Sequence, residues 1–247
     1  MALDPRNATV MDQTRSRADI DEGQRSYMLR VYNYMALGVA FTGVIVLLMA
    51  ANPNLMISLA TGPIKWVLFA GVFGMGMMSN KIMTMKSRMA AHAFFWAYAA
   101  LWGVMISPMV AYFLQTTEGT MDVARAFFIT SGMFAGASIF GYTTKKDLSG
   151  FGRFLVMAVI GLFIAALVNI FFIQSSGFSL LVSFGMVLLF AGMTAWETQK
   201  IKNMYYQAAG NTEMVARLAI LGAFVLYGSF VVMFIHVLNI LGMMRGE

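Results

Sequence analysis

The sequence predicts an all-α integral membrane protein, a bundle of seven transmembrane helices. Of its 247 residues, 60% are hydrophobic and only 11% are charged, whereas an ordinary soluble domain is about 45–50% apolar and about 25% charged. A soluble fold of this size could not hide so much apolar surface in one core. The apolar runs are continuous and do not alternate at every second residue, which indicates helices and not a β-barrel.

Seven apolar stretches are candidates for spans, because a helix needs about 20 mostly apolar residues to cross about 30 Å of hydrocarbon. They are residues 32–51, 64–80, 90–112, 124–142, 154–173, 178–197 and 218–241. The second stretch allows two interpretations, a full span or a shorter broken one, since three glycines and a methionine-rich stretch interrupt it. Residues 174–177 read as a tight turn, so the fifth and sixth spans should be antiparallel neighbours.

The first 30 residues differ from the rest, with five arginines and five acidic residues. We expect residues 1–24 to be a mobile polar tail and residues 25–244 to form the seven-helix transmembrane domain. From about Asp21 the tail should become a surface helix that leads into the first span. No signal-peptide pattern is visible, so the first span is expected to be an uncleaved anchor.

Lysine and arginine in the short connections predict the orientation. The tail and the connections 81–89, 143–153 and 198–217 hold fourteen of the seventeen basic residues. The other side holds only Lys65, Arg125 and Arg245. The chain should therefore lie in the cell inner membrane with its N-terminus in the cytoplasm and its C-terminus outside. The net charge of +6 suits contact with anionic lipid headgroups and requires no nucleic-acid partner.

Known enzyme motifs are missing from the chain, which has no GxSxG, HExxH or Walker loop and no cysteine. The glycines of Gly74-Met75-Gly76 lie inside an apolar run and cannot form a dinucleotide-binding turn. We expect a protein that is not an enzyme and has no cofactor.

Ten of the eleven acidic residues lie in tails or loops, or within a residue or two of them. The exception is Glu197, which lies at the end of the sixth span. An ionisable residue at membrane depth usually faces a bundle interior or a water pathway. Two interpretations stay open. Glu197 either reaches the cytoplasmic interface beside Lys200, or it faces the bundle as an ion gate, a pH sensor or a calcium ligand.

Other polar residues inside the spans are secondary candidates. His236 and Asn239 are three residues apart and share a helix face. Asn169 lies in the fifth span, and intramembrane amides are more often contacts between helices than ligands. His92 and His236 lack nearby carboxylates, so no metal site is expected from them.

Small residues form a stripe in the fourth span, Gly132-x-x-x-Gly136 followed by Ala137-x-x-x-Gly141. Such a stripe lets a neighbouring helix approach closely, and we expect this contact within the monomer. The stripe does not establish dimerisation, and the sequence leaves the oligomeric state open.

Three stretches of the chain are similar to the bacterial branch of the transmembrane Bax inhibitor motif family. They are the fourth span leading into GYTTKKDLS at 141–149, WETQKI at 196–201, and the last span from Leu226-Tyr227 to Gly242. The similarity covers roughly residues 25–244. The resemblance implies one central helix wrapped by the others and a proton-sensitive calcium leak across the membrane.

The same resemblance implies a latch of two carboxylates, one on each of the last two spans, that closes the cytoplasmic side. Glu197 matches the first carboxylate, although the family usually has Asp there. Ser229 stands where the family typically has the second, in Leu-Tyr-Leu-Asp-Phe, so the second carboxylate is missing. Glu197 and Ser229 can meet only if the last span begins outside the membrane or the sixth continues past Glu197.

Two functions follow as hypotheses. The first is a pH-influenced passive calcium leak in which Glu197 gates or binds the ion, since calcium prefers carboxylate oxygens. The second is a regulator without transport that restrains a membrane-bound ATP-dependent protease, as some bacterial relatives do, with the polar tail as the contact. The expected partners are membrane lipids, calcium as the transported ion and, in the second case, the protease.

Overall fold

The computed structural model describes the backbone of residues 5–85, 87–208 and 210–246. Within these ranges it describes the side chains from residue 21 onward, except those of residues 53 and 60. Every regular element in these ranges is helical. Six helices are long and apolar enough to cross a membrane. They are α1 (Pro5–Ala50), α4 (Arg88–Phe113), α5 (Thr117–Thr143), α6 (Ser149–Val168, extended by η2, Asn169–Ile173), α7 (Ser176–Ala208) and α8 (Thr212–Arg245). The predicted all-α membrane bundle is thereby confirmed.

The second predicted span takes the shorter, broken form. It consists of α2 (Pro53–Thr61), α3 (Ile64–Met77) and the 3₁₀ helix η1 (Ser79–Thr84). The 14 residues of α3 cover about 21 Å, less than the roughly 30 Å of a bilayer core. The chain nevertheless returns to the end of the bundle where α8 begins. There Arg217 donates to the carbonyl of Met83 at 3.2 Å, and Arg88 pairs with Glu213 at 2.8 Å.

The turn predicted at 174–177 is present between η2 and α7. Gln174 adopts a left-handed backbone conformation, with φ 52°. The side chain of Asn169 holds the turn, because its amide donates to the carbonyl of Ser175 and its oxygen accepts from the Ser175 N–H, both at 3.1 Å. Helices α6 and α7 pack against each other as antiparallel neighbours.

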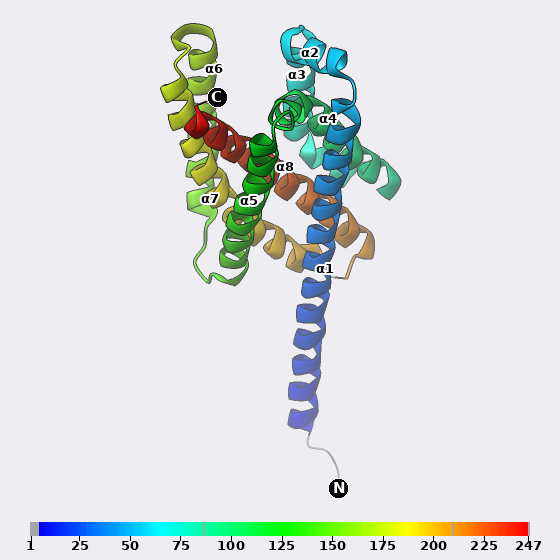
Figure 1. Ribbon diagram of the computed structural model, residues 1–247. Helices are drawn as coiled ribbons and strands as arrows, with labels where there is room; N and C mark the ends of the chain where they lie inside the picture. The colour runs from blue at the N-terminus through cyan, green and yellow to red at the C-terminus, as the bar shows by residue number, and fades with distance from the viewer. Residues whose placement is uncertain (1–4, 86, 209, 247) are drawn as a thin grey trace.

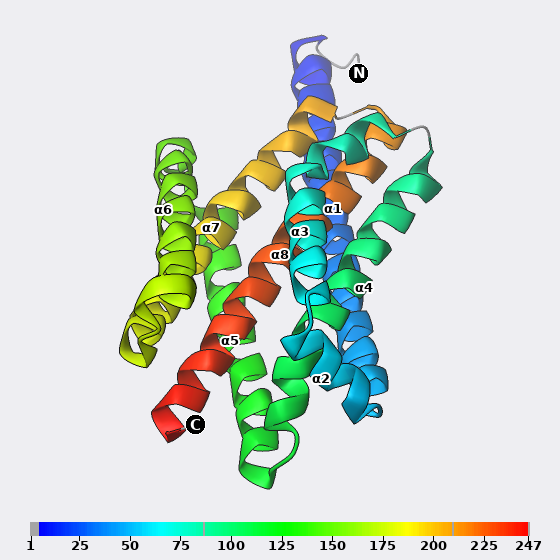
Figure 2. The same ribbon diagram turned by 90° about the horizontal axis from the view of Figure 1, so that it is seen from above.

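Helix α8 is the central element of the bundle (Figures 1 and 2). It packs against α1, α4, α5, α7 and η1. In the most apolar stretch of α8, 78% is buried inside the protein, compared with 6% in that of α6. Helix α6 packs on α7 at the edge of the bundle. The two helices are similarly apolar, so their position in the bundle, and not their apolarity, explains the difference in burial. This arrangement agrees with the central helix implied by the family resemblance.

The connections divide between two ends of the bundle. We call the end where α4 and α8 begin and where connection 144–148 lies the basic end. The end with connections 114–116 and 174–175 and with Arg245 is the Asp122 end. The predicted basic loops gather at the basic end. Helix α1 joins the bundle at the same end, where the Tyr27 hydroxyl donates to the carbonyls of Ile201 and Leu218, both at 3.4 Å. The chain therefore starts at one end and finishes near the other (Figure 1).

Helix α1 continues the first span far beyond the bundle, and Figure 1 shows its first part standing clear of the other helices. The backbone of residues 5–24, most of the predicted tail, belongs to this helix. Residues 1–4 of that tail lie outside the described residues. The mobility of the tail stays a prediction.

The predicted small-residue stripe of α5 is only partly correct. Gly141 lies against the backbone of Ala195 on α7, so any Cβ there would clash. Gly132 and Gly136, in contrast, have nothing within 4 Å of the position that a Cβ would take. The reason is geometric: Gly136 and Gly141 are five residues apart, which is about 140° around a helix, so they cannot share one contact face.

Candidate functional site

Glu197 of α7 and Ser229 of α8 are in direct contact inside the bundle. The Ser229 hydroxyl donates to Glu197 Oε2 at 2.7 Å. Both side chains are buried, with 6% and 3% of their surface exposed. Their contact fulfils the geometric condition set by the sequence, because α7 continues to Ala208, well past Glu197. The two positions that correspond to the family's carboxylates are therefore neighbours, with one acid and one alcohol.

The carboxylate of Glu197 has no ion-pair partner among the residues whose side chains the structure describes. Lys200, the cation expected to draw it to the interface, places its ammonium over the Trp196 ring, 5.2 Å from the centroid. Burying an unpaired carboxylate is costly, so such residues usually mark a functional position. The geometry favours the interpretation in which Glu197 faces the bundle.

Aromatic and hydroxyl groups surround this pair. On α4, the Tyr98 ring stacks on Phe224 of α8 with centroids 4.0 Å apart, and its hydroxyl lies beside Gly228. On the other side, Thr198 donates to Ser138 of α5 at 3.5 Å. The helices around the pair are thus joined by an aromatic stack between α4 and α8 and by a hydroxyl contact between α5 and α7.

The distinctive stretch 141–150 packs directly on the helix that carries Glu197. Gln199 donates to the carbonyl of Lys146 at 2.8 Å and accepts from the Leu148 N–H at 2.9 Å. Lys202 donates to the carbonyl of Tyr142 at 2.8 Å. These contacts, with the close approach of Gly141 to Ala195, fix α7 against the end of α5. Two of the stretches that carry the family resemblance therefore form one structural unit.

The whole chain also matches known proteins. The model of the family described as Inhibitor of apoptosis-promoting Bax1 matches residues 24–246. The chain belongs to this family. An uncharacterized protein of Rickettsia prowazekii is 39% identical over 242 residues, covering 96% of this chain and 97% of its own. The Escherichia coli inner membrane protein YbhL is 34% identical over 225 residues, covering 90% and 94%. The resemblance stated from the sequence is confirmed, and the chain is a multi-pass membrane protein of the Bax inhibitor family.

This Bax inhibitor family member has a second polar cluster between α7 and α8, closer to the Asp122 end. His236 Nδ1 lies 3.2 Å from the Ser183 hydroxyl, and Asn239 donates to the same hydroxyl at 2.8 Å. The shared face predicted for His236 and Asn239 is therefore real, and Ser183 is their common partner. This cluster and the Glu197 pair are separate, because Ser183 precedes Glu197 by about 21 Å along α7.

The other candidates lie elsewhere. Asn169 holds the η2–α7 turn and takes part in neither cluster. The His92 ring meets Tyr34 edge-on at 5.1 Å. Among the described residues no three His, Asp or Glu side chains gather into a metal-binding group.

Sequence reasoning missed Asp122, a second buried carboxylate. It pairs with Arg125 at 2.9 Å and Arg245 at 3.0 Å, and only 5% of its side chain is exposed. The predicted span began at 124, which put Asp122 in a connection, whereas α5 begins at Thr117. The spacing of Asp122 and Arg125, one helical turn apart, was the available signal.

Proposed function

We propose that the protein is a passive cation pathway, with calcium as the ion, and that Glu197 is its gate. The observation that carries this proposal is a buried carboxylate held by a serine hydroxyl on the central helix, with no ion pair to any basic side chain that the structure describes. Family membership supports it, since the resemblance implies a calcium leak. The hydrogen bond from Ser229 ties α8 to α7 and corresponds to the closed arrangement.

The chemistry of the site suits passage of calcium more than its storage. Calcium takes six to eight oxygen ligands, and carboxylates are its preferred protein donors. Glu197 supplies one carboxylate, and the Ser229 hydroxyl beside it is neutral. A passing ion would meet an attractive but incomplete site, which allows it to leave again. The proposed gate has a single carboxyl group that can bind a proton, so we expect the calcium leak to respond less to pH than in relatives with two carboxyl groups.

Calcium flux into proteoliposomes loaded with an indicator tests the proposal. Glu197→Gln keeps the size of the side chain and removes its charge, so the basal leak should change several-fold. The matched control is Glu118→Gln, because Glu118 is exposed in the first turn of α5. An unchanged leak in folded Glu197→Gln protein would contradict the proposal.

We also propose that the protein lies in the inner membrane with its basic end in the cytoplasm. The relative YbhL is named as an inner membrane protein, and basic loops favour the cytoplasmic side. The chain has no cysteine, so a single cysteine reports one position. In intact cells an impermeant thiol reagent should label Glu118→Cys and spare Lys145→Cys. The reverse pattern would overturn the orientation.

The alternative function is a regulator of a membrane-bound ATP-dependent protease. The feature that favours it is the first part of α1, which extends beyond the bundle where a partner could reach it (Figure 1). Deleting residues 1–24 separates the two functions. Loss of protease regulation with intact calcium flux would support the regulator, and loss of flux alone would support the pathway.

A further inference from the structure

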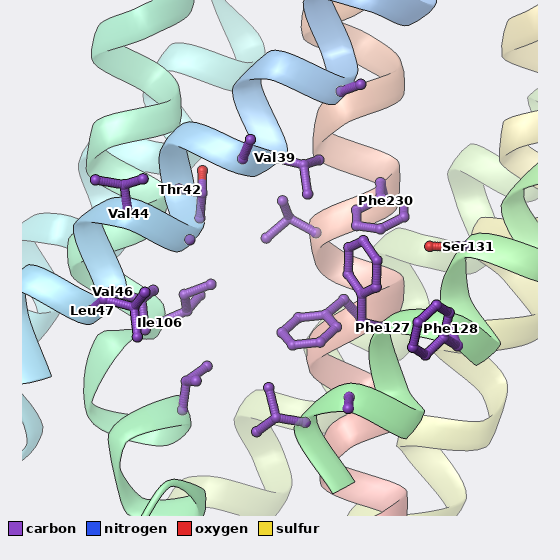
Figure 3. Close-up of a pocket in the computed structure, with 18 of the residues that line it drawn as sticks. Val39, Thr42, Val44, Val46, Leu47, Ile106, Phe127, Phe128, Ser131 and Phe230 are labelled. Carbon is purple, nitrogen blue, oxygen red and sulfur yellow. The ribbon is translucent and has the colours of Figure 1, made fainter. Parts of the chain in front are cut away.

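A large apolar groove opens between α1 and α5. Helix α1 packs on α4 and α8, and α5 packs on α7 and α8, so the two flank the central helix and leave a gap. The groove has a volume of about 900 Å³, at the upper end of the range for ligand pockets in proteins. Figure 3 shows Val39 and Leu47 on one wall, Phe127 and Phe128 on the other, and Phe230 of α8 at the back.

The shape and position of the groove suit a lipid chain. Its α1 wall extends from Tyr32 to Leu47, which is about 22 Å along a helix, most of the roughly 30 Å of a bilayer core. Both walls belong to candidate membrane spans, so the groove opens toward the hydrocarbon of the membrane. Its lining is almost entirely apolar, and Thr42, one of its few hydroxyls, already bonds to Tyr227 at 2.7 Å. Nothing in the groove requires a polar ligand.

The charge at one end of the groove indicates which lipid. Lys202 bridges the two walls at the basic end, since its carbonyl accepts from Gln24 of α1 at 3.4 Å and its ammonium donates to the Tyr142 carbonyl of α5 at 2.8 Å. Arg25 is exposed and lies two turns before Tyr32 on the same face of α1. Asp21 lies one further turn out, so Arg25 is the first charged residue on this face beyond the groove.

We propose that an anionic phospholipid occupies this groove, with its phosphate at Arg25 and Lys202 and an acyl chain along Phe127, Phe230 and Phe234. This lipid would lie against the face of α8 next to Ser229, whose neighbour in sequence is Phe230. The proposal does not depend on the proposed transport function, because it concerns binding alone.

Native mass spectrometry of the purified chain, with phosphatidylglycerol and phosphatidylcholine of matched chain length, tests both halves of the site. Gly43 lines the groove and has nothing within 4 Å of a Cβ position, so Gly43→Leu places a bulky side chain in the groove with no obstruction at its Cβ. Retention of phosphatidylglycerol should fall about tenfold, since each displaced methylene contributes roughly fourfold. Gly136→Leu is the matched control, because its Cβ is equally unobstructed and Gly136 does not line the groove.

The headgroup half is tested by charge. Arg25→Gln should lower the preference for phosphatidylglycerol about fivefold, the effect of one basic residue near an anionic headgroup. Arg153→Gln removes a cation from peripheral α6 and should leave the preference unchanged. A photoreactive phosphatidylglycerol with a diazirine in its acyl chain should also label peptides from 32–47 and 120–134 in liposomes.

Three results would overturn the proposal. They are equal retention by wild type and Gly43→Leu, equal retention of the two lipids by wild type, and a dimer that Gly43→Leu abolishes. The last would show that a second copy of the chain fills the groove.

Discussion

Glu197 and Asp122 are both buried carboxylates in membrane-spanning helices, and their surroundings differ completely. Asp122, near the end of the bundle, is held by two arginines. Glu197, deeper in the bundle, has a serine hydroxyl as its hydrogen-bond partner and no ion pair among the described side chains. A carboxylate between two cations is held in place by its ion pairs, whereas one without them can exchange its hydrogen-bond partner for another ligand. From this comparison we expect Asp122 to contribute to the stability of the fold and Glu197 to serve the function.

The largest expected effect on stability belongs to Asp122. Asp122→Asn removes the negative charge that pairs with Arg245, an arginine whose side chain is only 20% exposed. Removing one partner of a buried ion pair costs about 3–5 kcal/mol. Thermal unfolding in detergent should show a clear fall in Tm, with Glu118→Gln as the control. A melting temperature within a degree of wild type would show that the Asp122 cluster does not hold the bundle.

The two arginines should differ in the same assay. Arg245→Gln is expected to lower the stability of the protein more than Arg125→Gln does. The Arg125 side chain is 61% exposed, and exposed ion pairs contribute about 0–1 kcal/mol. Arg245 also lies over the Phe113 ring, 5.8 Å from the centroid, so its loss removes a second contact. Equal losses for the two variants would indicate that Asp122 needs only a general positive charge nearby.

Ser229→Ala should have a smaller effect on stability, about 1–3 kcal/mol, because it leaves the buried Glu197 oxygen without its donor. The double variant with Ser229→Ala and Glu197→Gln should lose no more free energy of unfolding than the two single variants lose together. It should lose less if the hydrogen bond is the main interaction between the two residues. A double-mutant cycle in detergent gives the coupling directly. Strict additivity would mean that the 2.7 Å contact contributes nothing to the fold.

Ser229→Asp should change the pH response and not only stability. Two carboxyl groups at hydrogen-bond distance resist being charged together, so their protonation is coupled. Calcium flux measured from about pH 5 to 8, the range in which physiological switches act, should become steeper and move toward neutral pH. A wild-type response as steep as that of Ser229→Asp would show that another group senses protons, with His92 and His236 the next to test.

The sequence predicted the architecture better than the contacts. Continuous apolar runs identified every long helix, and an acidic residue at the end of such a run identified Glu197. Helix ends were less predictable, because polar residues such as Thr117 and Glu118 can continue a helix beyond the apolar run. The extension of α5 back to Thr117 placed Asp122 inside that helix, and the extension of α7 to Ala208 allowed Glu197 to lie beside Ser229. Long-range partners such as Ser183 for His236 arise from packing and leave no local pattern.

The proposal that Glu197, with Ser229 bonded to it, gates a cation pathway can be tested with one thiol. The chain has no cysteine, so Ser229→Cys introduces a single reactive group of nearly the same size at the gate. A positively charged methanethiosulfonate reagent should reduce the calcium leak of this variant by more than half, and calcium should slow the reaction. Wild type and Ser107→Cys, buried on α4, should not respond. A Ser229→Cys leak that persists after the thiol has reacted would contradict the account.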